Sequence, residues 1–484
     1  MRTTTVTALA LALTAAATAP ATAASVPGKP GTDGLWRTDG YGTVLSLDGD
    51  TLQEFQTTSV SCLKGDSARR TGPGTYATAD GTTLTLRPGP GANRATLGYD
   101  TSVGHRSLRR IRKLPADCTR PTSEDARAAF DVFWHSFAEN YPFFAAKGVD
   151  WQAMRDRYRP QVHADTTRKE LFGIFSDMVR PLHDAHVAVL DGDQVFAQVR
   201  PGTEPPSPEL DARVKKFITE RDLGNAPYRQ DFANGRITYA DLPGRADRRA
   251  DQGYLRISGF AGYTAEDAPY PAHLAELDMA LDAILTTERT QRLKGLIIDL
   301  RINGGGSDAL GIHIAERFTD RPYVAYAKRA RNHPADPDRH TRPEPIRVVP
   351  AAGPRYTGPI AVLTSGTTVS AGESFTQALI DRPGGTVRIG QPTQGVFSDV
   401  MERSLPNGMT AILPNEEFLN RSGRTYDGTG IPPHLTEPVF TKEEFAEKRD
   451  SAFDRAVRVL RNDGQTEAMN SDQASGVSAS RGLR

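Results

Sequence analysis

The sequence predicts an α/β fold preceded by a small all-β domain. Two short apolar runs, residues 296–300 and 359–363, are each followed by a turn of small residues and then by a helical pattern. This order of strand, turn and helix is typical of βαβ units. A third observation predicts the all-β domain, because residues 35–118 alternate short strand-like runs with turn sequences.

Residues 1–23 have the composition of an export signal. Arg2 supplies a positive charge, residues 6–17 are apolar, and Ala21–Ala23 offer small residues for cleavage. The apolar run is short for a bilayer span, and no other window approaches 18 apolar residues. We therefore expect a secreted, extracellular chain without a membrane anchor. Residues 24–34 then form a linker rich in proline and glycine.

The β-rich domain, residues 35–118, carries two strong hairpin signals. Its stretches "LDGDTL" and "ADGTTL" place Asp-Gly between apolar residues. Both cysteines of the chain, Cys62 and Cys118, lie here. An oxidising compartment favours a disulfide between them, and two cysteines are too few for a structural zinc site. No catalytic combination of residues is evident, so we expect a structural or shielding role.

The overall composition excludes some classes of partner. The formal net charge is zero, and the one basic run, residues 104–114, is interpreted as a solvated strand or linker rather than as a binding patch. We therefore expect no nucleic-acid partner. At 484 residues the chain is too long for one ordinary core. Residues 462–484 are poor in apolar side chains and predict a disordered tail, and the oligomeric state is not predicted.

Residues 119–461 form the predicted main domain. Its first helix is predicted from a capping pattern at Thr122 and from one apolar stripe, formed by Phe130, Phe133, Trp134, Phe137 and Tyr141. Residues 441–461 predict a further amphipathic helix that begins at Thr441. In contrast, residues 192–235 are polar and contain prolines, and they predict a connection dominated by loops.

The two strand–turn–helix units contain candidate catalytic groups. Gly304, Gly305 and Gly306 follow the first predicted strand. They either form a tight turn or present backbone N–H groups as an oxyanion hole, since the P-loop signature is absent. In the second unit, Ser370 stands at the start of a predicted helix over residues 371–380. There it could cap the helix or act as a nucleophile beside the positive end of the helix dipole.

A serine nucleophile needs a base, and the base needs an orienting group. The stretch "MVRPLHDAHVAVLDGD" offers His183 and His186, whose spacing also fits a metal pair. No Glu stands at metalloprotease spacing, so we predict no metal and no other cofactor. His186, beside an apolar run, is the candidate base. Asp427, in "RTYDGTGIPPH", is either a turn former or the orienting carboxylate.

Seven stretches in this order resemble the serine peptidases of the C-terminal processing peptidase family, and more closely its tricorn-core branch. The resemblance covers roughly residues 123–440. The blocks "DLRINGGG" and "TVSAGESF" are specific together, although neither is specific alone. The stretches are "NYPFFAAKGVDWQAM", "LHDAHVAVL", "LIIDLRINGGGSDAL", "TVSAGESF", "GQPTQG", "LPNGMTAILP" and "YDGTGIPPH". The β-rich domain lies outside this family core.

The resemblance implies a crotonase-like peptidase core and a set of roles. Ser370 aligns with the nucleophile and His186 with the general base. The N–H of Ala371 and a glycine N–H of the 304–306 turn, for which we choose Gly305, would form the oxyanion hole. Asp427 falls where the tricorn branch has a glutamate.

One substitution decides between two catalytic systems within the family. Members that use a Ser-Lys dyad carry the lysine where this chain has Val396. The resemblance therefore implies a Ser–His–carboxylate system and a peptide or protein substrate. Two alternatives stay open: a non-catalytic protein that binds an apolar ligand on the same fold, and a crotonase-like acyl-CoA enzyme, which export disfavours. No peptide-binding PDZ pattern is evident in residues 191–250.

Overall fold

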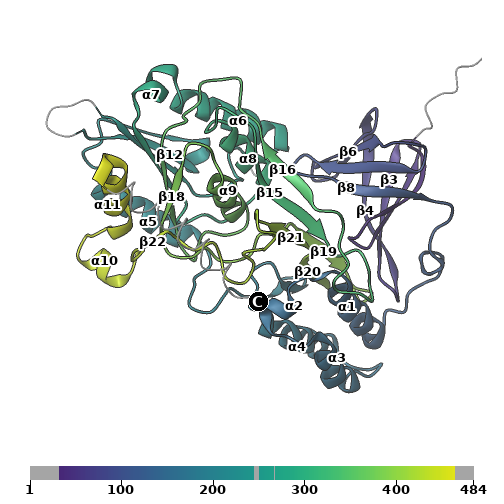
Figure 1. The fold of residues 1–484 in the computed structure, drawn as a ribbon. Coiled ribbons are helices and arrows are strands. Elements are labelled where there is room, and N and C mark those ends of the chain that lie inside the picture. The colour runs from purple at the N-terminus through teal and green to yellow at the C-terminus, as the bar shows by residue number, and fades with distance from the viewer. Residues whose placement is uncertain (1–31, 245–249, 266–267, 464–484) are drawn as a thin grey trace, which may run out of the picture.

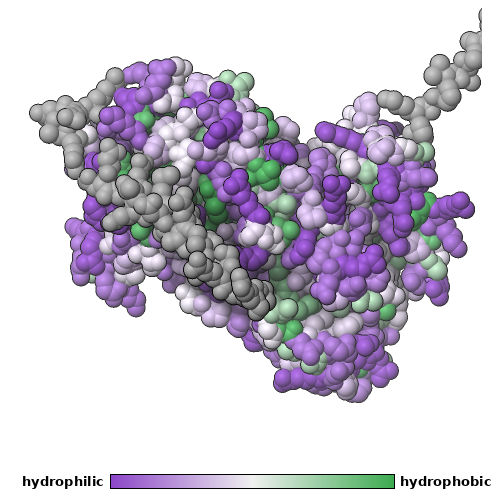
Figure 2. Space-filling view, viewed as in Figure 1, coloured by the Kyte–Doolittle hydropathy of each residue, from purple (hydrophilic) through white to green (hydrophobic). Residues whose placement is uncertain are grey.

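A computed structural model describes residues 32–244, 250–265 and 268–463. The predicted export signal, most of the predicted linker and residues 464–484 of the predicted tail lie outside the described residues. Within the described ranges the chain combines an N-terminal all-β domain with an α/β core, as the sequence predicts (Figure 1). Figure 2 shows that the surface is hollowed between the all-β domain, on the right, and the rest of the molecule.

The N-terminal domain is a closed, antiparallel barrel of eight strands. The strands are β1 (Gly34–Thr38), β2 (Thr43–Asp48), β3 (Thr51–Thr57), β4 (Cys62–Gly72), β5 (Thr75–Thr78), β6 (Thr83–Pro88), β7 (Arg94–Tyr99) and β8 (Arg106–Ile111). Pairing of β1 with β8 closes the barrel and leaves no free edge. The interior is filled by alternate side chains of the strands, including Trp36, Leu45, Leu52, Tyr76, Leu84, Leu97 and Leu108.

A disulfide joins Cys62 to Cys118, as predicted. Cys62 begins β4, and Cys118 lies in the short 3-10 helix η1 (Ala116–Thr119), between the barrel and the core. The bond closes a loop with a sequence separation of 56 residues. It therefore fixes the chain that leaves the barrel to the barrel wall, close to where the core begins.

The central sheet of the core has seven strands in the order β11-β12-β13-β14-β17-β18-β22. From β13 to β22 the neighbouring strands are parallel. The strands are β11 (Tyr228–Phe232), β12 (Ile237–Leu242), β13 (Gln252–Ile257), β14 (Gly295–Asp299), β17 (Ile360–Thr364), β18 (Thr386–Gly390) and β22 (Leu435–Thr436). β14 and β17 are buried throughout, which explains their continuous apolar sequences.

Helices cover both faces of this sheet. One face packs against α6 (Tyr270–Ile284), α8 (Asp308–Glu316) and α9 (Ala371–Ile380), and the other against α5 (Pro208–Arg221) and α11 (Ser451–Arg458). Neighbouring residues of β14 serve opposite faces, since Ile298 packs in the first cluster and Ile297 in the second. The short helix α7 (Thr287–Arg292) precedes β14.

A second layer of the core surrounds α1 (Ala126–Asn140), whose aromatic stripe packs inward as predicted, with Trp134 partly buried and the other four side chains buried. It packs with α2 (Phe144–Lys147), α3 (Trp151–Tyr158), α4 (Arg168–Val179) and a sheet of β10 (Gln194–Ala197), β9 (Ala188–Asp191), β20 (Thr410–Pro414) and β19 (Val400–Ser404). A third sheet consists of β16 (Glu344–Val348), β15 (Tyr323–Ala330) and β21 (Glu416–Leu419). The cap of α1 is Asp125, which accepts from the Ala128 N–H, rather than Thr122.

Two regions differ from the sequence-based expectations. The supposed loop region 192–235 contains α5, because Ser207 caps a helix that has Pro208 at its first position, and its apolar face packs on the sheet. The helix expected over residues 441–461 is divided into α10 (Lys442–Ala446) and α11. Lys448 adopts a left-handed φ of 48° between them, and Asp450 caps the new helix.

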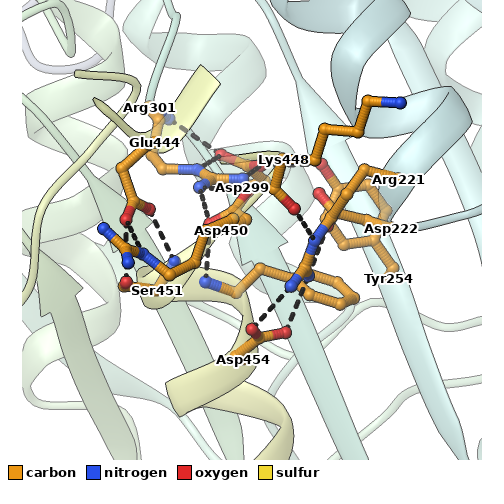
Figure 3. A network of polar contacts seen from close by, with 12 residues as sticks. Arg221, Asp222, Tyr254, Asp299, Arg301, Glu444, Lys448, Asp450, Ser451 and Asp454 are labelled. Atoms are coloured by element: carbon orange, nitrogen blue, oxygen red, sulfur yellow. Dashed lines mark hydrogen bonds and ion pairs between the residues drawn. The ribbon is translucent and has the colours of Figure 1, made fainter. Parts of the chain in front are cut away.

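A buried network links this C-terminal segment to the end of β14 (Figure 3). The Arg301 side chain is fully buried and donates to Asp299 and Asp450. Its guanidinium also lies 4.2 Å from the centre of the Phe440 ring. The backbone carbonyl of Arg301 accepts from the Ser365 hydroxyl at 2.5 Å. The network therefore stabilises the chain just before both the 304–306 turn and the Ser370 turn, which carry the candidate catalytic groups.

Candidate active site

Ser370 lies in a strained turn between β17 and α9. Its backbone has φ 56° and ψ −118°, a conformation that side-chain-bearing residues rarely adopt. Ser370 is partly exposed and lines a cavity of about 1170 Å³ between the barrel and the core. A sharp strand-to-helix turn that presents a serine in this way is the arrangement of a nucleophile elbow, although the G-x-S-x-G sequence is absent.

Glu373 stabilises the elbow through buried hydrogen bonds, and the sequence analysis missed this residue. Its fully buried carboxylate accepts from the backbone N–H groups of Ser370 (3.2 Å), Gly395 (2.7 Å) and Val396 (2.9 Å). Burial raises the pKa of Glu373 to about 7, while its hydrogen bonds oppose the shift. The available signal was a glutamate three residues after a serine at a helix start, the spacing of a capping box.

We expect Glu373→Gln to destabilise the protein by about 1–3 kcal/mol at pH 8, where the carboxylate is ionised. The glutamine NH₂ group cannot accept, so at least one buried N–H loses its partner. Urea unfolding followed by circular dichroism measures the change. The matched control is Glu170→Gln, because Glu170 occupies the same position of α4 but is exposed. Equal effects of the two substitutions would contradict the role given to Glu373.

The glycine turn lies directly beside the elbow. A Cβ on Gly305, which has φ 80°, would come within 2.7 Å of the Ser370 Cβ, so this close approach requires glycine. The Gly305 N–H, however, donates to Asn303 Oδ1 at 2.9 Å. In the described part of the chain, the N–H groups of Gly306 and Ala371 have no hydrogen-bond acceptor. Gly306 is therefore a rival to Gly305 as an oxyanion donor, together with Ala371.

His186 lines the same cavity as Ser370. It lies in the turn before β9, where its backbone N–H donates to Asp184 Oδ1 at 2.9 Å, and Tyr141 donates to the other carboxylate oxygen at 2.8 Å. Burial lowers the pKa of the His186 imidazole, and the charges of Asp184 and Asp399 oppose this shift. The His186 Nδ1 is buried without a hydrogen-bond partner among the described residues. The neutral imidazole is therefore the favoured form.

Asp427 is buried but is not joined to His186. Its carboxylate accepts from the Phe397 N–H at 3.1 Å and from the Thr425 hydroxyl at 2.5 Å. Burial raises the pKa of Asp427 well above its ordinary value, although these hydrogen bonds lower it. Within the described ranges, no hydrogen bond connects Asp427 with His186. The structure thus brings Ser370 and His186 to one cavity but does not complete the relay that the sequence predicts.

Two further observations concern ligands and membranes. In the residues that the structure describes, no group of three or more His, Cys, Asp or Glu side chains has the geometry of a metal site. A search of the same residues for membrane-spanning helices finds none that is sufficiently long and apolar.

Two protein-family models match parts of the chain. Residues 251–436 match the model of peptidase family S41, and residues 122–180 match the model of the tricorn protease C1 domain. No curated protein matches the chain.

Two solved structures share the fold. One is a putative peptidase from Parabacteroides merdae ATCC 43184, with a TM-score of 0.57 and 24% identity, covering 71% of this chain and 98% of that one. The other is mature CPAF, with a TM-score of 0.51 and 14% identity, covering 70% of this chain and 98% of that one. Residues 251–436, which match the model of peptidase family S41, contain both the glycine turn and the Ser370 elbow. The family resemblance is therefore confirmed: residues 251–436 match peptidase family S41, a segment that matches the tricorn protease C1 domain precedes them, and these matches indicate a serine-type peptidase.

Proposed function

We propose that the protein is a secreted serine peptidase that cleaves peptide or protein substrates through an acyl-enzyme on Ser370. The observation that carries the proposal is the strained backbone of Ser370 at the start of α9, with the free Ala371 N–H beside it. A strained conformation persists only where the surrounding structure enforces it, and such residues cluster at active sites. His186 lines the same cavity, and its imidazole can act as the general base that a serine nucleophile needs.

The chemistry follows the order of a serine peptidase. His186 takes the Ser370 proton while Oγ attacks the peptide carbonyl, and it later donates that proton to the leaving amine. The oxyanion is stabilised by the Ala371 N–H and by a glycine N–H of the 304–306 turn, each contributing roughly 3 kcal/mol to the barrier reduction. Water then hydrolyses the acyl-enzyme.

We propose Asp427 as the group that orients His186, because Asp427 falls where the tricorn branch has a glutamate. In the present geometry its oxygens serve Phe397 and Thr425. The proposal therefore requires that the free Nδ1 of His186 meets the Asp427 carboxylate when substrate is bound. Asp184 already binds the backbone N–H of His186 and is the rival carboxylate.

Intact-mass spectrometry of the non-reduced, secreted protein after fluorophosphonate treatment tests the proposed function. We expect one adduct on the wild type and a much slower reaction of His186→Ala, because only an activated serine reacts. The same spectrum reports export, since cleavage near Ala23 would shorten the chain. A folded wild-type protein without an adduct would favour the alternative of a non-catalytic protein that binds an apolar ligand.

The pH dependence of kcat/KM should report His186. Its pKa lies below the ordinary value of 6.5 because the half-buried imidazole is shielded from water, and only the neutral form can accept the Ser370 proton. Activity that depends on His186 is therefore lost as pH falls, with a midpoint below 6.5. His183→Ala is the control, because His183 is exposed and should leave the midpoint unchanged. A midpoint above 7 would contradict this assignment.

A further inference from the structure

The loop that joins β7 to β8 reaches from the barrel to the glycine turn of the core. The Ser307 hydroxyl donates to the Thr101 carbonyl at 2.6 Å. The Val103 N–H donates to Asp308 Oδ1 at 2.9 Å. Ser307 directly follows Gly306, and Asp308 is the first residue of α8. The barrel loop thus binds the segment that carries the candidate oxyanion donor.

The same loop also binds the side of the cavity that holds the candidate base. The Ser102 hydroxyl donates to Asp399 Oδ2 at 2.5 Å and accepts from Lys328 at 3.3 Å. Asp399 and His186 line the same cavity, and the Asp399 charge partly opposes the lowering of the imidazole pKa. Ser102 of the barrel therefore contacts Asp399, on the His186 side of the cavity. Its neighbours Thr101 and Val103 contact the segment that follows the glycine turn.

Lys328 makes this connection rigid. Its buried ammonium lies 2.7 Å from Asp308 Oδ2 and 3.2 Å from Asp399 Oδ2, and it stands 4.6 Å from the centre of the Phe418 ring. Burial alone would lower the pKa of Lys328, but Asp308, Asp399 and Glu416 raise it well above its ordinary value. A charge buried among several carboxylates depends on each polar partner, because water cannot replace a lost contact. The Ser102 hydroxyl is one of these partners.

We propose that the barrel is a working part of the active site, and that Ser102 is a positioning residue which holds the oxyanion turn in register with His186. This inference rests on the proposed function of Ser370. The shield role expected from the sequence would need only that the barrel covers the cavity. The observed bonds instead run from one short loop to both sides of the reaction centre.

Steady-state kinetics of Ser102→Ala and Ser102→Thr test the inference. We expect kcat of Ser102→Ala to fall roughly 10- to 100-fold with KM within about threefold, because small misplacement of reacting groups is costly. The rate of fluorophosphonate labelling should fall in parallel, since the phosphonyl oxygen needs the same donors. Ser102→Thr keeps the hydroxyl and should restore most of kcat. The control is Ser67→Ala, because Ser67 is exposed on β4 away from the cavity.

The outcomes separate the inference from the function on which it rests. If Ser102→Ala loses thermal stability but keeps the wild-type kcat, the loop only attaches the barrel, and the inference is overturned. If Ser102→Ala does not fold, Asp399→Asn probes the same bridge from the core side with little change of volume, and a wild-type kcat there overturns the inference. A wild type that neither hydrolyses peptides nor reacts with the fluorophosphonate overturns the proposed function, and the inference with it.

Discussion

Replacing Ser370 by alanine is expected to abolish peptide hydrolysis, with kcat falling roughly 10⁴- to 10⁶-fold. The substitution removes the only atom that can form the acyl-enzyme in the proposed mechanism. The surrounding backbone should change little, because the buried Glu373 carboxylate holds the elbow through backbone N–H groups and not through the serine hydroxyl. Initial rates on a mixture of fluorogenic peptides, measured beside the wild type, give the ratio.

Two further substitutions make this result specific. Ser374→Ala removes a hydroxyl one turn further along α9, where it donates to the Ala371 carbonyl and not to a group of the proposed mechanism, so hydrolysis should remain within a few-fold of wild type. Ser370→Gly should be as inactive as Ser370→Ala but more stable than it by about 1 kcal/mol, since glycine accepts a positive φ without strain. Hydrolysis that survives both Ser370 substitutions would exclude this serine as the nucleophile.

The elements around the site were predictable because their signals are local. β14 and β17 are buried on both faces and appear in the sequence as continuous apolar runs. The helix predicted over residues 371–380 is present with the same bounds. Cap residues set helix starts within three or four positions, which is why Thr441 was recognised and the break before Asp450 was not: the second cap lies inside an uninterrupted amphipathic pattern.

The parts of the site that could not be predicted from the sequence depend on contacts between distant segments. The Glu373 carboxylate accepts from the N–H groups of residues 395 and 396, and the sequence around Ser370 does not predict this contact. The hairpins of the barrel were predictable from Asp-Gly turns, but closure of β1 on β8 and the contact of Ser102 with Asp399 were not. Tertiary contacts of this kind leave no periodicity in the sequence, so a structural or shielding role was expected for the barrel.

The substitution Asp450→Asn is expected to lower the free energy of unfolding by about 3–5 kcal/mol, the usual cost of breaking a buried ion pair from one side. The Asp450 carboxylate lies 2.6 Å from the buried Arg301 guanidinium (Figure 3) and is itself buried. Asparagine keeps the volume and the oxygen that caps α11 by accepting from the Phe453 N–H. The substitution therefore isolates the lost negative charge, of which Asp299 can compensate only a part.

Chemical denaturation of Asp450→Asn beside Glu447→Gln measures this contribution. Glu447 pairs with Arg449 at the surface of the same C-terminal segment, where both side chains are about half exposed, and solvent screening should make its loss barely measurable. Because the Arg301 carbonyl accepts from Ser365, loss of Asp450 should also loosen the turn before the elbow and lower kcat. An unfolding midpoint equal to that of Glu447→Gln would show that the neighbouring carboxylates Asp299 and Asp222 neutralise Arg301 without Asp450, and that the C-terminal helices do not support the active site through this pair.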